Sequence, residues 1–283
     1  MIAVRELSYT YPGAARPAIE GLSFTVAPGE IFGLLGPSGA GKSTTQKILI
    51  GLLRGYAGEV RVFGRDLTSW GGDYYERIGV GFELPSHFQR LSARRNLAFF
   101  AALYRGPTRP ADELLALLGL AGDADTPVER FSKGMQTRLG IARALLHRPE
   151  LIFLDEPTAG LDPVSARAVR ELIRAQRDEG RAVVLTTHNM ALADELCDRV
   201  ALLVDGRIAQ IDAPRALRLR YGAPRVRVEY LCGGLRSAEF PLEGLADNQA
   251  FQRLLREAPI QTIHSREATL EDVFVAVTGR GLS

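Results

Sequence analysis

The stretch GPSGAGKST at residues 36–44 contains the residue types that bind phosphate groups. It fits the pattern G-x-x-x-x-G-K-[ST], in which glycines let backbone N–H groups surround a β-phosphate and a lysine reaches the β and γ oxygens. The hydroxyl of the last pattern residue, here Ser43, holds Mg²⁺. The candidate nucleotide-binding residues of this stretch are Gly36, Ser38, Gly39, Ala40, Gly41, Lys42, Ser43 and Thr44.

Two acidic residues follow an apolar run in LIFLDEP, residues 151–157. The run predicts a buried strand with Asp155 and Glu156 at its end. We expect Asp155 to hold the Mg²⁺ shell, and Glu156 to take a proton from the attacking water, a role typically worth about 10²–10⁴ in rate. The strand RAVVLTTH ends at His188, a second catalytic candidate, because sites in open α/β sheets gather at the carboxyl ends of strands.

A second stretch, FSKGMQTRLGIARALL at residues 131–146, predicts a Gly-containing turn that leads into a long helix. A helix start offers unpaired N–H groups and a partial positive charge, so it also suits a phosphate. The chain therefore carries two candidate phosphate-binding helix starts in separate parts of its sequence.

The elements that would position these residues form an α/β frame. EIFGLLG, residues 30–36, predicts a buried strand that runs into the first phosphate loop, and a helix follows with Ile48, Leu49, Leu52 and Leu53 on its apolar side. With 283 residues, 46% of them hydrophobic, the chain is long enough for a full core and a second, smaller one.

Composition excludes several classes of protein. A net charge of +2 gives no basic field of the kind that nucleic-acid binders show, so no nucleic-acid partner is expected. The two cysteines have no metal-ligand spacing and predict a reducing compartment. The N-terminus lacks the layout of a signal peptide, and no run approaches the roughly 20 apolar residues of a membrane span. We expect a soluble chain, with any membrane role coming through a partner.

In type and order, these motifs resemble the nucleotide-binding subunit of an ABC (ATP-binding cassette) transporter, over residues 1–220. GPSGAGKST resembles Walker A, LIFLDE resembles Walker B with the catalytic glutamate, and FSKGMQ resembles the signature usually written LSGGQ. AGLD at 159–162 resembles the D-loop and His188 the switch histidine. The resemblance implies an α/β P-loop NTPase fold: a RecA-like core, an antiparallel β subdomain and an inserted helical subdomain at 91–146.

The resemblance also implies that ATP and Mg²⁺ are bound and that ATP is hydrolysed to ADP and phosphate between two cassettes packed head to tail. The second cassette is another copy of the chain or a paired subunit. The start of one chain's signature helix, with Ser132, Lys133 and Gly134, would contact the γ-phosphate held by the other chain, and Asp162 of the D-loop would also bind nucleotide. Lys133 departs from the family pattern, which has glycine there. Because ADP lacks the γ-phosphate, hydrolysis would let the dimer open.

Two further positions follow from the resemblance. Tyr11, in LSYTYPG, falls where the family places the aromatic residue that stacks on adenine, with Tyr9 as the alternative. Glu83, in IGVGFELPSHFQRLS, occupies the place of a glutamine that senses Mg²⁺ and the attacking water. We expect Glu83 to be a metal ligand, the alternative being a side chain that points to solvent.

The sequence divides into a cassette at 1–222 and a small C-terminal α+β appendage at 223–283. We expect a hairpin turn at Asp205-Gly206, a second hairpin around Gly233-Gly234 and a strand in PIQTIHSR. DNQAFQRLLREA predicts a helix capped by Asp247, and the last helix begins at a T-x-x-D cap at Thr269 and ends at Gly279.

The ending TLEDVFVAVTGRGL resembles exporter-type ABC ATPases whose permease is a separate chain, which implies a place at the cytoplasmic face of the membrane, bound through that permease. The appendage alternatively serves only to stabilise the dimer. A non-transport ABC ATPase of translation or DNA repair is the competing function, and a regulator that does not hydrolyse ATP is opposed by the presence of Glu156 and His188.

Overall fold

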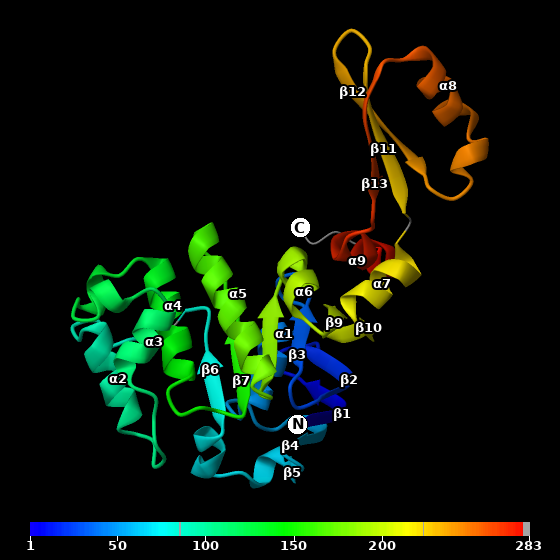
Figure 1. Cartoon of the computed structure of the whole chain (residues 1–283). Coiled ribbons are helices and arrows are strands. Elements are labelled where there is room, and N and C mark those ends of the chain that lie inside the picture. Colours follow the sequence, from blue (N-terminus) through cyan, green and yellow to red (C-terminus); the bar gives the residue numbers. More distant parts are fainter. Residues whose placement is uncertain (85, 223, 280–283) are drawn as a thin grey trace. The chain divides into compact units, whose positions relative to one another are not determined.

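The computed structural model describes residues 1–84, 86–222 and 224–279, which form two compact units, Met1–Ile211 and Asp212–Ser283. The first unit is built on a six-stranded sheet in the order β10-β9-β3-β8-β7-β6 (Figure 1). Its strands are β3 (Ile31–Leu35), β6 (Ile78–Gly81), β7 (Leu151–Asp155), β8 (Ala182–Thr187), β9 (Arg199–Val204) and β10 (Arg207–Asp212). The strands β6, β7, β8, β3 and β9 pair in parallel.

The carboxyl ends of β3, β7 and β8 lie side by side. Leu35 pairs with Thr187 and Asp155 pairs with Thr186 in the register of the sheet. Apolar, almost fully buried strands are typical of parallel sheets, which are covered on both faces. The phosphate loop and the two acidic residues are therefore brought together at one edge of the core, as the sequence predicts.

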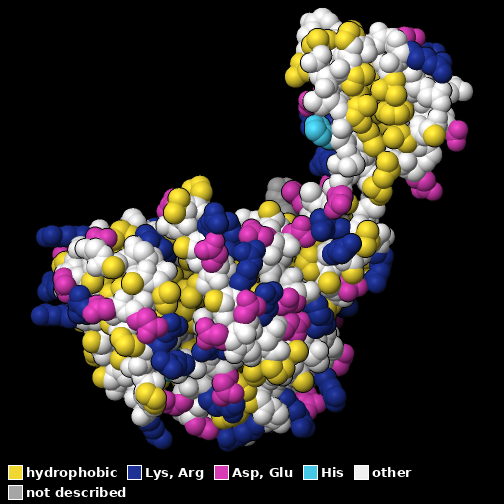
Figure 2. Space-filling view, viewed as in Figure 1, with side chains coloured by type: hydrophobic (Ala, Val, Ile, Leu, Met, Phe, Trp, Pro, Cys, Tyr) yellow, Lys and Arg dark blue, Asp and Glu magenta, His cyan; other side chains and the backbone are white. Residues whose placement is uncertain are grey.

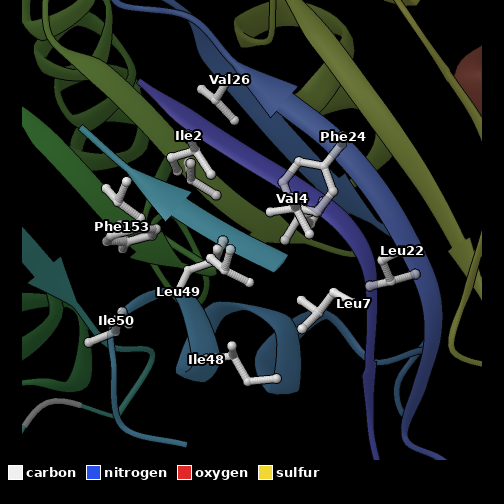
Figure 3. Close-up of a cluster of buried hydrophobic side chains, with 14 of the residues drawn as sticks. Ile2, Val4, Leu7, Leu22, Phe24, Val26, Ile48, Leu49, Ile50 and Phe153 are labelled. Atoms are coloured by element: carbon white, nitrogen blue, oxygen red, sulfur yellow. The ribbon is translucent and has the colours of Figure 1, made fainter. Parts of the chain in front are cut away.

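A second sheet, in the order β2-β1-β4-β5, covers one side of this core. Its strands are β1 (Ile2–Tyr9), β2 (Ile19–Val26), β4 (Ala57–Val62) and β5 (Arg65–Asp66), and the pairs β1–β2, β1–β4 and β4–β5 are antiparallel. Apolar side chains from β1 and β2, among them Val4 and Phe24, pack with Ile48 and Leu49 of α1 (Lys42–Leu49) and with Phe153 of β7 (Figure 3). Anchoring α1 in the core fixes the loop that precedes it.

The helix α1 is shorter than the sequence pattern indicates. It ends at Leu49, so Leu52 and Leu53 lie beyond it, and Leu52 is 53% exposed. Gly51, with a φ of 84°, breaks the helical conformation because such a dihedral angle belongs to the left-handed region. Only Ile48 and Leu49 of the expected apolar face are buried in the core.

Three helices form the segment expected to be helical at 91–146: α2 (Ala93–Ala101), α3 (Ala111–Leu117) and α4 (Lys133–Ala144). They contact one another, and α4 also contacts β6 (Figure 1). The remaining helices of the first unit are α5 (Pro163–Asp178) and α6 (Met190–Leu196), which pack on β8. No helix in the described part of the chain is long and apolar enough to cross a membrane.

The second unit contains α7 (Pro214–Tyr221), α8 (Gln249–Glu257), α9 (Leu270–Thr278) and a sheet in the order β12-β11-β13. The strands are β11 (Arg225–Leu231), β12 (Leu235–Pro241) and β13 (Ile260–Arg266), all antiparallel. Within this unit Phe240 of β12 contacts Phe251 of α8 edge to face, and hydrophobic side chains gather between the sheet and α8 (Figure 2).

Most local predictions for the tail agree with the structure. Thr269 and Asp272 form a reciprocal capping box, and Gly279 ends α9 with a φ of 67°. The Asp205-Gly206 turn has both residues at positive φ, the conformation that two-residue hairpin loops require. Asp247 is not the cap of α8: the cap is Asn248, whose Oδ1 accepts from the N–H of Phe251 at 3.0 Å, while Asp247 belongs to a short 3₁₀ turn before it.

The compact units meet between Ile211 and Asp212, earlier than the boundary placed at 222–223 by sequence, because α7 packs on α9. Residue 223 and residues 280–283 of the expected appendage lie outside the described residues. The division into a cassette that folds without the appendage stays a prediction.

Candidate functional site

The phosphate loop opens onto a cavity of about 310 Å³ in the first unit. Its lining brings together residues from five separate segments of the sequence: Ala18, Ser38, Gly39, Gly41, Lys42, Ser43, Thr44, Glu83, Asp155, Glu156 and His188. Every predicted catalytic and metal-binding residue is in this set. The sequence did not indicate Ala18, which precedes β2 and reaches the cavity only through the packing of the two sheets.

Two positions of the loop must be glycine because neighbouring atoms leave no room for a Cβ. A Cβ on Gly36 would lie 2.2 Å from the carbonyl oxygen of Leu203, and one on Gly41 would lie 2.6 Å from Cγ2 of Ile19. Gly41 also has a φ of 104°, which side chains rarely adopt. The loop conformation that frees N–H groups for phosphate therefore depends on these two positions.

Lys42 is buried at the start of α1. Its Nζ donates to the carbonyl oxygens of Gly36 at 2.6 Å and Pro37 at 2.9 Å. Burial lowers the pKa of this ammonium group, while the nearby carboxylates Glu156 and Asp155 act in the opposite direction. The result is a positive charge held at the wall of the cavity, beside the loop carbonyls.

Asp155 and Glu156 differ in their surroundings although they are adjacent. Burial raises the pKa of Asp155, opposed by a hydrogen bond in which the hydroxyl of Thr186 donates to Oδ1. Glu156 follows with a φ of 46°, a left-handed conformation, and its N–H donates to the carbonyl oxygen of Thr186 at 3.0 Å. The abrupt change of direction after Asp155 turns the side chain of Glu156 toward the end of β8.

Three groups at the end of β8 hold the Glu156 carboxylate. Thr187 Oγ1 donates to Oε2 at 2.8 Å, the backbone N–H of His188 donates to Oε1 at 2.9 Å, and His188 Nδ1 lies 2.6 Å from Oε1. The sequence predicted Glu156 and His188 but missed Thr186 and Thr187, whose hydroxyl groups orient the two acids. The two consecutive threonines directly before His188 were the sequence feature that could have indicated these hydroxyl groups.

The donor set of the cavity fits Mg²⁺ bound together with a nucleotide. Within the described residues, no group of three or more His, Cys, Asp or Glu could hold a metal ion by itself. Ser43, Asp155 and Glu83 nevertheless line one cavity. One or two carboxylates, a hydroxyl and phosphate oxygens are the ligands that Mg²⁺ takes in nucleotide sites.

Tyr11 presents an accessible ring beside the loop. It is 37% exposed, and its hydroxyl lies 3.2 Å from Oγ1 of Thr44. Tyr9 is only 9% exposed and packs edge to face against Tyr11, with ring centroids 5.0 Å apart. Of the two candidates for adenine stacking, only Tyr11 offers a free face.

The remaining predicted nucleotide ligands are not in the lining of this cavity. Ser132 caps α4 by accepting from the N–H of Met135 at 3.2 Å, and Lys133 and Gly134 follow in the first turn. Asp162 caps α5, accepting from the N–H groups of Val164 and Ser165 at 3.0 Å each. Gly134 lies against the loop before α5, where its Cβ would be 3.2 Å from Leu161 Cδ2.

The described chain thus carries its two candidate phosphate-binding helix starts at different places: α1 at the cavity and α4 beside the loop that leads to α5.

Comparison with known proteins identifies this arrangement. A family model described as "ABC transporter" matches residues 19–159. A fluoroquinolones export ATP-binding protein of Mycobacterium tuberculosis strain H37Rv is 58% identical over 285 residues, covering 100% of this chain and 95% of the relative.

The chain belongs to the ABC transporter family.

Further relatives and solved structures agree with this ABC cassette. A Nod factor export ATP-binding protein I of Rhizobium sp. strain N33 is 36% identical, covering 93% of the chain and 92% of the relative. A solved ATP-binding subunit of an ABC transporter has a TM-score of 0.71 and 31% identity, covering 78% of this chain and 93% of its own. A dimeric ATP-binding cassette in a post-hydrolysis state with ADP and Pi has a TM-score of 0.67 and 27% identity, covering 75% of this chain and 98% of its own.

These findings confirm the predicted family, its fold and the exporter-type branch. The protein is an ATP-binding subunit with ATPase activity, and a non-transport ABC ATPase is not favoured. Residues 224–267, in the second unit, match a model described as "Fluoroquinolone efflux ABC transporter C-terminal domain".

Proposed function

We propose that two copies of this cassette close head to tail around two ATP molecules with Mg²⁺, and that this closure drives a separate membrane permease in export. The observation that carries the proposal is the composition of the cavity. It contains the phosphate loop, the acids and His188, but no residue from 131–136. A nucleotide bound there leaves one side for the exposed α4 start of another chain.

The two sides of this composite site do different things. In one chain, Lys42 and the loop N–H groups bind the phosphates, Tyr11 stacks on the base, and Asp155, Glu83 and Ser43 hold the metal. In the other chain, Ser132, Lys133 and Gly134 contact the γ-phosphate and Asp162 stands beside them. Loss of the γ-phosphate removes this second set of contacts, so the dimer opens.

Hydrolysis depends on how Glu156 is held. Its carboxylate accepts three hydrogen bonds at the end of β8, so its position relative to the cavity is fixed before any reaction. From there Glu156 takes the proton of the attacking water, and His188, 65% exposed in its side chain, is placed to contact the γ-phosphate. Bound Mg²⁺ would neutralise charge on the phosphate oxygens.

The permease would bind an aromatic surface on the helical segment. Phe88, Phe99 and Phe100 contact one another, with Phe88 and Phe99 centroids 4.7 Å apart, and both of those rings are more than 40% exposed. Figure 2 shows hydrophobic side chains at the surface around α2 and α3. Exposed apolar groups of this kind mark sites of protein contact, and an amphipathic helix of the permease is the occupant we propose.

Contacts beneath this aromatic surface connect it to the catalytic parts. His87, next to Phe88, donates through Nε2 to the carbonyl oxygen of Gln136 in α4 at 2.9 Å. Arg143 of α4 donates to the carbonyl oxygen of Ser86 at 2.7 Å and stacks over Phe100. These contacts link the segment that carries Glu83 to the helix that carries Lys133. We therefore expect a permease that displaces the aromatic surface to move both of them.

The test is to co-express the tagged chain with a candidate exporter permease and to isolate the membrane fraction. We expect the permease to co-purify and ATPase activity to depend on it, with the chain at the cytoplasmic face. Phe99→Asp should abolish recovery in membranes, whereas Leu219→Asp, an exposed apolar residue of α7, should not. Equal recovery of the two variants would contradict the aromatic surface. Compounds of the fluoroquinolone class are the first substrates to assay, given the 58% identical relative.

A further inference from the structure

Glu83, after β6, and Lys133, at the start of α4, carry opposite charges, and neither side chain has a partner among the described residues. Neither side chain forms an ion pair or hydrogen bond with another residue that the structure describes. Glu83 lines the cavity, whereas Lys133 does not.

The cavity is short of positive charge. Among the described residues, its lining holds three carboxylates, Glu83, Asp155 and Glu156, and one ammonium group, that of Lys42. A nucleoside triphosphate adds further negative charge, of which one bound Mg²⁺ would offset only part. Because like charges repel strongly in a partly dehydrated site, the third carboxylate, Glu83, weakens ATP-dependent closure unless a further cation approaches it.

The position of Lys133 allows its ammonium group to contact another chain. It is the first residue of α4, it is exposed, and its stem lies along Gly160, where a Cβ would be 3.7 Å from Cδ of the lysine. The stem is supported by this contact and the ammonium group is left free. A lysine ammonium is compact and reaches beside a phosphate where a guanidinium fork does not fit, and this chain has only three lysines.

Glu83 lines the cavity from the edge of the sheet. It follows β6, which is the edge strand of the six-stranded sheet, whereas Asp155 and Glu156 follow the inner strand β7. Because Glu83 is partly exposed, a second chain that covers the cavity can contact it.

We propose that Lys133 of a second copy of this chain pairs with Glu83 across the composite ATP site, so that the two residues form a charge pair between chains that compensates the extra carboxylate. This inference rests on the proposed head-to-tail dimer. The two residues then act together in dimerisation, because the lysine compensates a charge that is present only while the glutamate is.

The experiment measures ATP-dependent dimerisation of the full chain in a Glu156→Gln background, by sizing chromatography or light scattering over a range of protein concentrations. Lys133→Met should weaken dimerisation at least about tenfold, because Glu83 is left uncompensated. Adding Glu83→Gln to the same chain should restore most of this loss. Glu83→Gln alone, assayed at saturating Mg²⁺, should dimerise as well as the double variant.

Mixing two variants tests whether the pair forms between chains. When Lys133→Met chains are mixed with Glu83→Gln chains carrying a second tag, the mixed dimer contains one intact pair and one site where both charges are gone. We expect the mixed dimer to form as well as the reference and to dominate over the Lys133→Met homodimer. A pair within one chain would give no such rescue, since each Lys133→Met chain would retain its own uncompensated Glu83.

The outcomes separate this inference from the function on which it rests. If the Glu156→Gln reference forms no dimer with ATP, the head-to-tail dimer is wrong and the charge pair is wrong with it. If the reference dimerises but Glu83→Gln fails to rescue Lys133→Met, in one chain or in the mixture, the dimer stands and the pair is overturned. Circular dichroism and thermal unfolding of each single variant, compared with the reference, show that each has folded.

Discussion

One oxygen of Glu156, Oε1, is shared by the backbone N–H and the ring of His188, at 2.9 Å and 2.6 Å. The histidine therefore positions the carboxylate in two ways, of which only one depends on its side chain. The carboxylate is 11% exposed and the histidine side chain 65% exposed, so the carboxylate is held inside while the histidine lines the cavity.

Glu156→Gln should preserve ATP binding, lower turnover by about 10²–10⁴ and trap an ATP-bound dimer, because the amide keeps the shape of the carboxylate but accepts no proton. Sizing chromatography with ATP, together with a phosphate-release assay, measures both effects. A monomer that still hydrolyses ATP would show that another group is the base.

Thr187→Val should lower the turnover of ATP with little change in ATP affinity, because it removes the hydroxyl that donates to Glu156 Oε2 at 2.8 Å. The other oxygen keeps its partners, so we expect a loss of about tenfold, smaller than for Glu156→Gln. Thr187→Ser retains the hydroxyl and is the matched control. Steady-state kinetics in which serine and valine behave alike would exclude the hydroxyl as a positioning group.

Gly134→Asp should abolish dimerisation and hydrolysis, because it places a carboxylate where, in the proposed dimer, the α4 start meets the γ-phosphate held by the other chain. ATP binding by one chain should change little, since Lys42 and Tyr11 are untouched. Gly134→Ala is the control for added side-chain volume without charge. Its Cβ would meet Leu161 Cδ2 at 3.2 Å, a contact that a small shift of the leucine relieves. Loss of ATP binding with dimerisation intact would contradict the cross-chain site.

Glu83→Gln should be tolerated with a modestly raised Mg²⁺ requirement, while Glu83→Ala should impair turnover more, because the amide retains one oxygen ligand and alanine has none. Glu83 lines the same cavity as Ser43 and Asp155, which supports its place near the metal. ATPase rates titrated against Mg²⁺ decide this. Curves identical to the unmodified protein for both variants would remove Glu83 from the metal site.

Removing the appendage should leave a cassette that binds ATP, and the structure indicates where to cut. Leu217 of α7 is fully buried in the second unit, where α7 packs on α9. A chain ending at 222 keeps α7 without that partner, so residues 1–211 should be less prone to aggregate than residues 1–222. Light scattering and ATP-analogue binding compare the two. A folded 1–211 chain that fails to bind ATP would show that the second unit supports the nucleotide site.

Sequence alone determined the parts of the site that local chemistry dictates. An apolar strand leads directly into Gly41, Lys42 and Ser43, where a helix starts, and a second apolar strand ends at Asp155. In each case one short stretch of sequence encodes both the local structure and the side chains that could bind phosphate or metal. The capping box at Thr269 and Asp272 was readable for the same reason: both partners lie within one turn.

Tertiary structure alone decided everything that depends on contacts between distant stretches. Thr187 orients Glu156 only because β7 and β8 are neighbours in the sheet, and Tyr9 is buried while Tyr11 stays accessible only because of how the two sheets pack. The place of α7 followed from its contact with α9, which no pattern within α7 records. Helices, strands and loops follow from residues near in sequence, but the orientation of a side chain in a site follows from which strands lie next to each other, and that is a property of the whole folded chain.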